Sequence, residues 1–431
     1  MNILERSARQ WATEFAAVRP GSAVLHAFAR AVLGSVSEPG DGVLGRAIAA
    51  IGSERTAELL LARASADQLS GAVTDAGGHL DEQEAGTGLG RWLPRLDQAS
   101  FARSLVQAAR VRALFVVPGD GSWPEQLDEL GDHAPLGLWV RGRADALALA
   151  TPTIALVGAR AATGYGEHVA MEASAGLVDR GFAIVSGGAY GIDGMAHRAA
   201  LASHGRTVAF LAGGVDRFYP LGHESLLTRI AETGAVMSEM PCGAAPTKWR
   251  FLQRNRLIAA SAGATVVLEA GMRSGSLNTA GHAAALGRPL GAVPGPVTSP
   301  ASAGCHRLLR EFGAVCVVDA DQMAELAAGV IEPRGRADAP ASRTADGNMP
   351  APAPSPASSA DPAPEVVRVT DALSTRSPRS LDDIARRAGM SVHEVMAVLG
   401  PLDVSGVVVR HPDGWLRRRA ARASSRVRGT P

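Results

Sequence analysis

The chain has 431 residues, of which 46% are hydrophobic, and 43 basic residues against 42 acidic ones leave a net charge of +1. This length predicts two or three domains, and the balanced charge excludes nucleic-acid binding through global charge, so any such affinity needs a local patch. The three cysteines are too few for a disulfide framework and lack the spacing of a zinc site. The N-terminus lacks the apolar run of a signal peptide and no apolar stretch is long enough to span a bilayer, so we expect a cytoplasmic protein without a membrane contact.

The first part of the chain, residues 1–110, predicts a helical domain. It is rich in Ala, Leu and Arg, and its apolar residues recur with helical spacing, as at Leu25, Phe28, Ala29 and Val32. The following residues predict a strand, a Trp-Pro turn and a second strand that ends at Val140. We interpret this pair of strands as an adaptor that leads into a larger sheet.

From Thr153 onward, short apolar runs alternate with helical patterns. Successive runs begin 24 to 30 residues apart, and this alternation predicts an α/β domain with a doubly wound, mostly parallel sheet. The predicted strands are Ile154–Val157, Ala183–Val185, Val208–Leu211, Ala235–Met237, Thr265–Leu268, Leu290–Val293 and Ala314–Val318.

The C-terminal part predicts a linker, a small domain and a tail. Residues 332–364 are dominated by Pro, Ala and Ser, a composition typical of a disordered linker. In residues 365–418, Ser380 and Ser391 are expected helix caps, Gly389 is an expected helix end, and a hairpin follows, which together predict a winged helix. Residues 419–431 form an Arg-rich tail that we expect to be disordered.

Loops after three of the predicted strands indicate a binding cleft. In a parallel sheet, ligands bind beyond the carboxyl ends of the strands, where glycines and helix N-termini favour anions. Asp193 in the second loop is expected to cap the following helix, and His197 to be packed or hydrogen-bonded rather than bound to a metal. The residues that we expect to line the cleft are Gly158, Arg160, Ser186, Gly187, Ser274, Gly275, Ser276 and Thr279.

The segment PTKWRFLQRNR, residues 246–256, mixes cations with aromatic rings. Lys248 is the only lysine of the chain, and Phe251 lies among the basic side chains Lys248, Arg254 and Arg256. Cations that meet phosphates and rings that stack on unpaired bases suit single-stranded nucleic acid. An alternative is that the arginines pair with acids such as Glu239 and Glu269 while the aromatic residues fill the core.

Several enzyme signatures are absent from the sequence. It has no GxxxxGK[ST] phosphate loop and no carboxylate cluster for two metal ions. The glycines of the first loop, Gly158, Gly164 and Gly166, have the wrong spacing for GxGxxG, and no acidic residue ends the second strand, where a dinucleotide ribose would bind. We therefore expect a binding protein rather than an enzyme, with no catalytic residue, no metal and no cofactor.

These motifs resemble those of the DNA-processing protein A family (DprA/Smf). The similar segments are VGAR-AT-YG, SGGAYGID, RFLQRNRLIA and EA-SGSLNTA, within about residues 112–318. The resemblance implies a SAM-like helical domain, an extended Rossmann-like domain over residues 111–331 that binds single-stranded DNA, and a homodimer that loads the recombinase RecA onto incoming DNA in natural transformation. It also implies that Lys248, Phe251, Arg254, Asn255 and Arg256 join the cleft residues in a DNA pocket.

Two alternatives remain open on the sequence. Nucleotide-processing enzymes of the lysine-decarboxylase-like Rossmann group share the fold, but their PGGxGTxxE motif supplies a catalytic Glu that the corresponding EAGMRSGSLNTA lacks. The winged helix could instead be the main DNA reader, although its expected recognition helix, residues 391–399, has no Arg or Lys. Six cations could reach phosphate, namely Arg160, Lys248, Arg250, Arg254, Arg256 and Arg273. If all six did, the logarithm of the binding constant would fall with that of salt at a slope of about −4.

Overall fold

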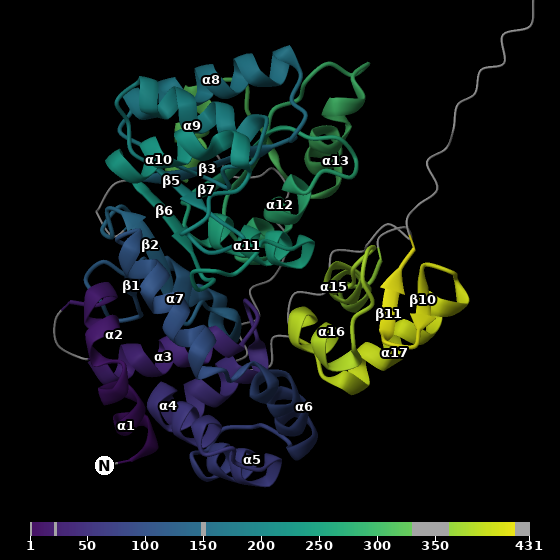
Figure 1. Cartoon of the computed structure of the whole chain (residues 1–431). Coiled ribbons are helices and arrows are strands. Elements are labelled where there is room, and N and C mark those ends of the chain that lie inside the picture. The colour runs from purple at the N-terminus through teal and green to yellow at the C-terminus, as the bar shows by residue number, and fades with distance from the viewer. Residues whose placement is uncertain (1, 21–23, 148–151, 330–361, 419–431) are drawn as a thin grey trace, which may run out of the picture.

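The computed structural model describes residues 2–20, 24–147, 152–329 and 362–418, and it is coloured along the chain in Figure 1. A group of N-terminal helices, a large α/β domain and a small C-terminal domain follow one another. Residues 332–361 of the predicted linker and the predicted tail lie outside the described residues. The first residue of α15 is Pro364, which the sequence had assigned to the linker.

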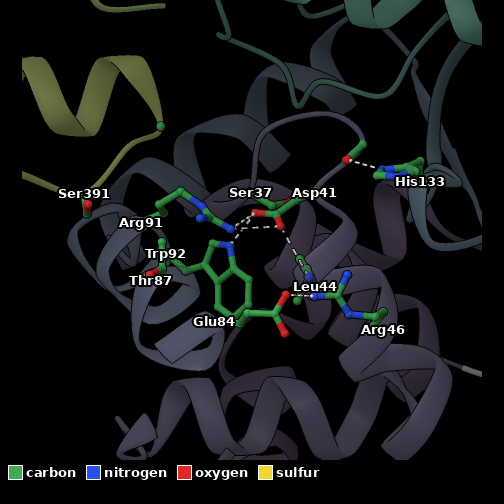
Figure 2. Close-up of polar contacts among 12 residues, drawn as sticks. Ser37, Asp41, Leu44, Arg46, Glu84, Thr87, Arg91, Trp92, His133 and Ser391 are labelled. Carbon is green, nitrogen blue, oxygen red and sulfur yellow. Dashed lines mark hydrogen bonds and ion pairs between the residues drawn. The ribbon is translucent and has the colours of Figure 1, made fainter. Parts of the chain in front are cut away.

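The N-terminal part is helical, as predicted. Asp41 caps α4 by accepting a hydrogen bond from the backbone N of Leu44 at 3.3 Å, and it also accepts one from the indole Nε1 of Trp92 at 2.8 Å (Figure 2). This carboxylate therefore joins α4 to α6. The helices are α1 (Ile3–Gln10), α2 (Ala12–Val18), α3 (Val24–Val36), α4 (Gly42–Leu61), α5 (Ala66–Asp75), α6 (Glu82–Trp92) and α7 (Gln98–Arg110), with a 3-10 turn η1 (Leu93–Arg95).

The described residues of the α/β domain form a nine-stranded sheet in the order β1-β2-β6-β5-β4-β3-β7-β8-β9. Strands β3 to β9 pair in parallel, whereas β1 pairs with β2 and β2 with β6 in antiparallel fashion. The parallel sheet and the adaptor strands are therefore confirmed. The strands are β1 (Leu114–Val116), β2 (Leu138–Gly142), β3 (Thr153–Gly158), β4 (Ala183–Ser186), β5 (Thr207–Phe210), β6 (Ala235–Ser238), β7 (Ala264–Glu269), β8 (Leu290–Ala292) and β9 (Val315–Cys316).

Helices cover both faces of this sheet (Figure 1). One apolar cluster joins α8, α9 and α14 to β3, β4 and β7, and another joins α11, α12 and α13 to the opposite face. The helices are α8 (Gly164–Asp179), α9 (Ile192–Ala202), α10 (Glu224–Thr233), α11 (Lys248–Ala260), α12 (Ser276–Ala285), α13 (Ala303–Glu311) and α14 (Ala320–Ala327), with 3-10 turns η2 (Glu125–His133), η3 (Leu221–His223) and η4 (Pro300–Ser302).

The N-terminal helices share a core with the sheet. A single cluster of buried side chains runs from Phe15 and Phe28 to Phe115 of β1 and Trp139 of β2. The rings of Phe15 and Phe115 lie 6.5 Å apart, and those of Phe115 and Trp139 lie 4.7 Å apart. This cluster spans the predicted domain boundary at residue 110. Because apolar surface is buried across that boundary, the helical part and the α/β domain stabilise each other.

The C-terminal domain has the two helices and the hairpin that the sequence predicts for a winged helix, and a further helix that was not predicted precedes them. Its elements are α15 (Pro364–Ala372), α16 (Leu381–Ala388), α17 (Val392–Val404), β10 (Val408–His411) and β11 (Gly414–Arg417). Ser380 and Ser391 cap α16 and α17, and Gly389 ends α16 in the left-handed conformation at φ 64°. Within the described ranges, no helix is both long and apolar enough to cross a bilayer.

Candidate nucleic-acid interface

The candidate site lies at the carboxyl edge of the parallel sheet. Gly158 ends β3, Ser186 ends β4 and Glu269 ends β7, and these three neighbouring strands run in the same direction. Their loops therefore meet at one edge, where open α/β sheets bind ligands. Gly158 leaves room for α9, since a Cβ atom there would lie 2.5 Å from Cγ1 of Ile192.

An exposed cation and two aromatic rings form the outer part of the site. The guanidinium carbon of Arg160 lies 4.8 Å from the ring centroid of Phe251, and Arg160 is exposed while Phe251 is half-buried. The ring centroid of Tyr219 lies 5.6 Å from that of Phe251, and Tyr219 is 50% exposed. Arg160 and Phe251, which the sequence selected separately, are thus brought together.

Tyr219 is a residue that our sequence analysis did not select for the pocket. It lies in the connection that follows β5, so it reaches the same edge of the sheet as the other loops. The sequence pattern that could have selected Tyr219 for the pocket is an aromatic residue in the loop after a predicted parallel strand. The sequence alone gave no indication that this ring would lie beside Phe251, which is on a different element.

Arg254 lies inside the site and shapes one of its loops. It is 6% exposed, and its Nη1 donates hydrogen bonds to the carbonyl oxygens of Gly187 at 2.6 Å and Phe210 at 2.5 Å. Burial lowers its pKa to about 10, although the nearby Asp193 carboxylate opposes that shift. A Cβ atom at Gly187 would lie 2.1 Å from Nη1 of Arg254, so the close approach requires glycine.

Asp193 does not cap its helix, contrary to the prediction. The N-cap position of α9 is Gly191, and Asp193 lies in the first turn. Its Oδ2 accepts hydrogen bonds from the backbone N atoms of Gly187 at 3.2 Å and Ala189 at 3.4 Å, so it holds the preceding loop. Burial raises the pKa of Asp193, and the Arg254 guanidinium acts in the opposite direction.

Two arginines of the segment 246–256 are engaged by acids. Arg256 is 3% exposed, and its Nη2 lies 2.6 Å from Oε2 of Glu239. Arg250 forms two hydrogen bonds with Glu38, from Nε at 3.0 Å and from Nη2 at 2.7 Å. The alternative interpretation of paired arginines therefore describes Arg256 and Arg250, and the six-cation count overstates the cations that face solvent.

The loop after β7 is joined to α11 by Asn255. Its Nδ2 donates to the carbonyl oxygen of Gly275 at 3.3 Å and to Oδ1 of Asn278 at 3.1 Å. The hydroxyls of Ser274 and Ser276 lie 2.7 Å apart, and a Cβ atom at Gly275 would have nothing within 4 Å. The hydroxyl and amide residues at the start of α12 therefore lie beside α11, with open space at Gly275. The backbone N–H groups of Ser274, Leu277 and Asn278 bond to carbonyl oxygens within this loop.

Three of the predicted hydroxyl residues are buried. Ser186 is fully buried and donates to the carbonyl oxygen of Leu156 at 2.7 Å, and Ser276 and Thr279 are also buried. Lys248, the first residue of α11, and Arg273, in the loop after β7, are exposed. The predicted site residues thus divide into an exposed set that can meet a ligand and a buried set that holds the loops.

The described part of the chain has no group of three His, Cys, Asp or Glu side chains that could hold a metal ion. His197 is fully buried, and its Nδ1 lies 2.7 Å from Oγ1 of Thr207, so the expected hydrogen-bonded histidine is confirmed. Burial lowers the pKa of His197 to about 3. Glu269 accepts hydrogen bonds from the backbone N of Thr163 at 2.9 Å and from its hydroxyl at 2.6 Å, so it positions the loop after β3.

Comparisons with known proteins agree with this architecture. Residues 114–328 match the family model described as DNA recombination-mediator protein A, and residues 351–414 match the DprA winged helix domain. The Smf protein of Escherichia coli is 35% identical over 310 residues, which cover 71% of this chain and 78% of that protein. A Mycobacterium tuberculosis H37Rv relative described as a DNA processing protein DprA is 44% identical over 326 residues, which cover 73% of this chain and 79% of the relative.

A solved structure shows the same fold. The crystal structure of DNA processing protein A (DprA) from Streptococcus pneumoniae aligns with a TM-score of 0.55 and 30% identity, over 69% of this chain and 96% of that chain. The sheet with its loops, the winged helix and these relatives lead to one conclusion: the chain belongs to the DprA/Smf family of DNA processing proteins.

Proposed function

We propose that this protein binds single-stranded DNA at the carboxyl edge of its parallel sheet and acts without catalysis. The observation that carries the proposal is the exposed Arg160 guanidinium over the Phe251 ring, with Tyr219 beside it. A cation next to two accessible rings offers a phosphate contact and a stacking surface at the same place. Base stacking on such rings contributes about 1–3 kcal/mol per base and tolerates any sequence.

The arrangement favours a single strand over a duplex. Phe251 and Tyr219 can stack only on a base whose face is free, and the bases of a duplex are already stacked on their neighbours. The open glycine at the start of α12 and the partly exposed Ser274 beside it suit a phosphate of the same strand. The buried residues Arg254 and Asn255 support this surface from behind.

The salt dependence of binding follows from the exposed cations. Arg160, Lys248 and Arg273 are exposed, whereas Arg250 and Arg256 are held by carboxylates. With about −0.7 per phosphate contact on a single strand, three contacts give a slope of about −2 for the logarithm of the binding constant against that of salt. A slope near −4 would mean that the paired arginines also reach phosphate.

The wider role is part of the same proposal. Membership of a family described as DNA recombination mediators supports a protein that protects incoming single-stranded DNA and loads RecA recombinase onto it, as in natural transformation. We place this role in the cytoplasm and assign it to a homodimer. Faster assembly of RecA on an oligonucleotide coated with this protein than on one coated with a heterologous single-strand-binding protein would support the loading step.

The central test is the Arg160→Ala variant. We expect its affinity for a labelled oligo-dT to fall about tenfold at low salt, with the salt slope shallower by about 0.7, because one phosphate contact is lost. Fluorescence anisotropy across a salt series, with a matched duplex alongside, measures both quantities. Arg310→Ala, which removes an exposed arginine in the last turn of α13, is the matched control. Equal affinities for duplex and single strand, or an unchanged Arg160→Ala variant, would contradict the proposed site.

A further inference from the structure

The winged helix is docked on both other parts of the protein. Its helix α15 lies beside α11, and α16 lies toward the N-terminal helices (Figure 1). Arg95 Nε donates to the carbonyl oxygen of Arg386 at 2.8 Å, and Arg91 lies 3.9 Å from the Glu394 carboxylate. Figure 2 shows Ser391 at the start of α17 close to Arg91 of α6. The contact is polar and spans several elements.

One acid of the winged helix occupies the start of α11. Oδ2 of Asp371, near the end of α15, accepts a hydrogen bond of 2.6 Å from the backbone N of Lys248. The first N–H groups of a helix have no partner within the helix, and the N-terminus attracts anions. Thr247 is the N-cap residue of α11, and its hydroxyl accepts a hydrogen bond from the backbone N of Arg250. The cap therefore does not bind the backbone N of Lys248, which donates to Asp371 instead.

A half-buried cation of the winged helix lies next to this contact. Arg368 of α15 lies with its guanidinium carbon 5.5 Å from the Trp249 ring centroid, and its Nε donates to the carbonyl oxygen of Ala388 at 2.9 Å. Burial lowers the pKa of Arg368, and the Glu38 carboxylate acts in the opposite direction. The docked domain therefore covers part of Trp249, which is half-buried and lies directly beside the exposed Lys248.

We propose that the docked winged helix competes with single-stranded DNA for the first turn of α11, where the Asp371 carboxylate occupies the amide that a DNA phosphate would take. This inference rests on the proposed function. A carboxylate and a phosphate are both anions that bind helix N-terminal amides, and one N–H accommodates one of them. The negative charge of Asp371 next to Lys248 also opposes the approach of a polyanion. DNA that binds α11 therefore displaces the winged helix, and displacement uncovers Trp249 and the surface around Arg95.

The proposal is tested in the full-length chain with the Asp371→Asn variant. Loss of the carboxylate weakens docking, so the affinity for oligo-dT should rise about three- to tenfold at low salt, since apparent affinity scales with the binding-competent fraction. Glu394→Gln is a second variant, because Gln preserves the capping box of α17 while the charge that faces Arg91 is removed. It should raise the affinity in the same direction. Asp382→Asn, an exposed acid on α16, is the matched control and should bind like the wild type.

Hydrogen–deuterium exchange reports docking independently of affinity. The first turn of α11 should exchange faster in Asp371→Asn without DNA, and segments 91–95 and 386–391 should exchange faster in the wild type when oligo-dT is added. Tight binding of oligo-dT with equal or lower affinity in Asp371→Asn would overturn the competition and leave the proposed function intact. Unchanged exchange of segments 91–95 and 386–391 in the wild type when oligo-dT binds would also overturn the proposed competition. If the wild type binds no oligo-dT at all, both proposals fail.

Discussion

At the scale of single residues, Gly187 and Arg254 depend on each other. The guanidinium of Arg254 is fixed by two backbone carbonyls, so it cannot retreat from a new side chain at Gly187. Gly187→Ala should therefore push the loop or the arginine out of place and cost about 1–3 kcal/mol of unfolding free energy, as overpacking does. The affinity for oligo-dT should fall as well, because Arg254 supports the surface that carries Phe251.

The control for this prediction is Gly164→Ala. Gly164 is the first residue of α8, and a Cβ atom there would have nothing within 4 Å. Urea unfolding and anisotropy of the two variants separate a steric effect from a general glycine effect. A Gly187→Ala protein as stable and as tightly bound to oligo-dT as the Gly164→Ala protein would refute the close contact.

At the scale of elements, α11 has cations with two different tasks. Lys248 is exposed at its first turn, whereas Arg250, Arg254 and Arg256 point into the protein and meet carboxylates or carbonyl groups. The helix therefore binds the rest of the molecule with one set of cations and leaves the other end to a ligand. The number of basic residues in the sequence of α11 does not show which of them are exposed and which are paired inside the protein.

This division predicts opposite results for two substitutions on α11. Lys248→Ala should leave the unfolding free energy within about 0.5 kcal/mol and make the salt slope for oligo-dT shallower by about 0.7. Arg256→Ala should lower the unfolding free energy by about 3–5 kcal/mol, because the buried Glu239 loses its partner. Its salt slope should stay that of the wild type. Urea titration and anisotropy measure both variants, and a shallower slope in Arg256→Ala would show that this residue reaches phosphate.

At the scale of the whole molecule, Glu38 connects all three parts. It pairs with Arg95 in the N-terminal helices and with Arg250 on α11, and it lies against Gly389 of the winged helix. Burial alone would raise its pKa, but Arg250 and Arg95 outweigh burial and lower it to about 2. The folded protein therefore holds Glu38 as a carboxylate at any pH near neutrality.

The Glu38→Gln variant tests the contribution of these ion pairs to stability. Removal of one partner of a buried ion pair should cost about 3–5 kcal/mol of unfolding free energy at pH 7. Since the folded pKa is below the unfolded one, the wild-type contribution is complete above about pH 4.5 and is lost as the pH falls toward 2. Glu38→Gln should therefore lose less stability over that interval than the wild type. Urea midpoints between pH 7 and pH 3 measure this, with the exposed Glu325→Gln as control; parallel curves for all three proteins would contradict the prediction.

The sequence by itself determined the elements of this protein, because their signals are local. Apolar runs that alternate with helical patterns predicted β3 to β9. Ser380, Gly389 and Ser391 marked ends of α16 and α17 through bonds within a few residues. Only the tertiary structure decided which charges face solvent. Arg250 meets Glu38 across 212 positions and Lys248 meets Asp371 across 123, and no local pattern encodes such partners. These partners form in the folded protein because a buried charge or a buried backbone N–H group is costly unless it is paired or hydrogen-bonded.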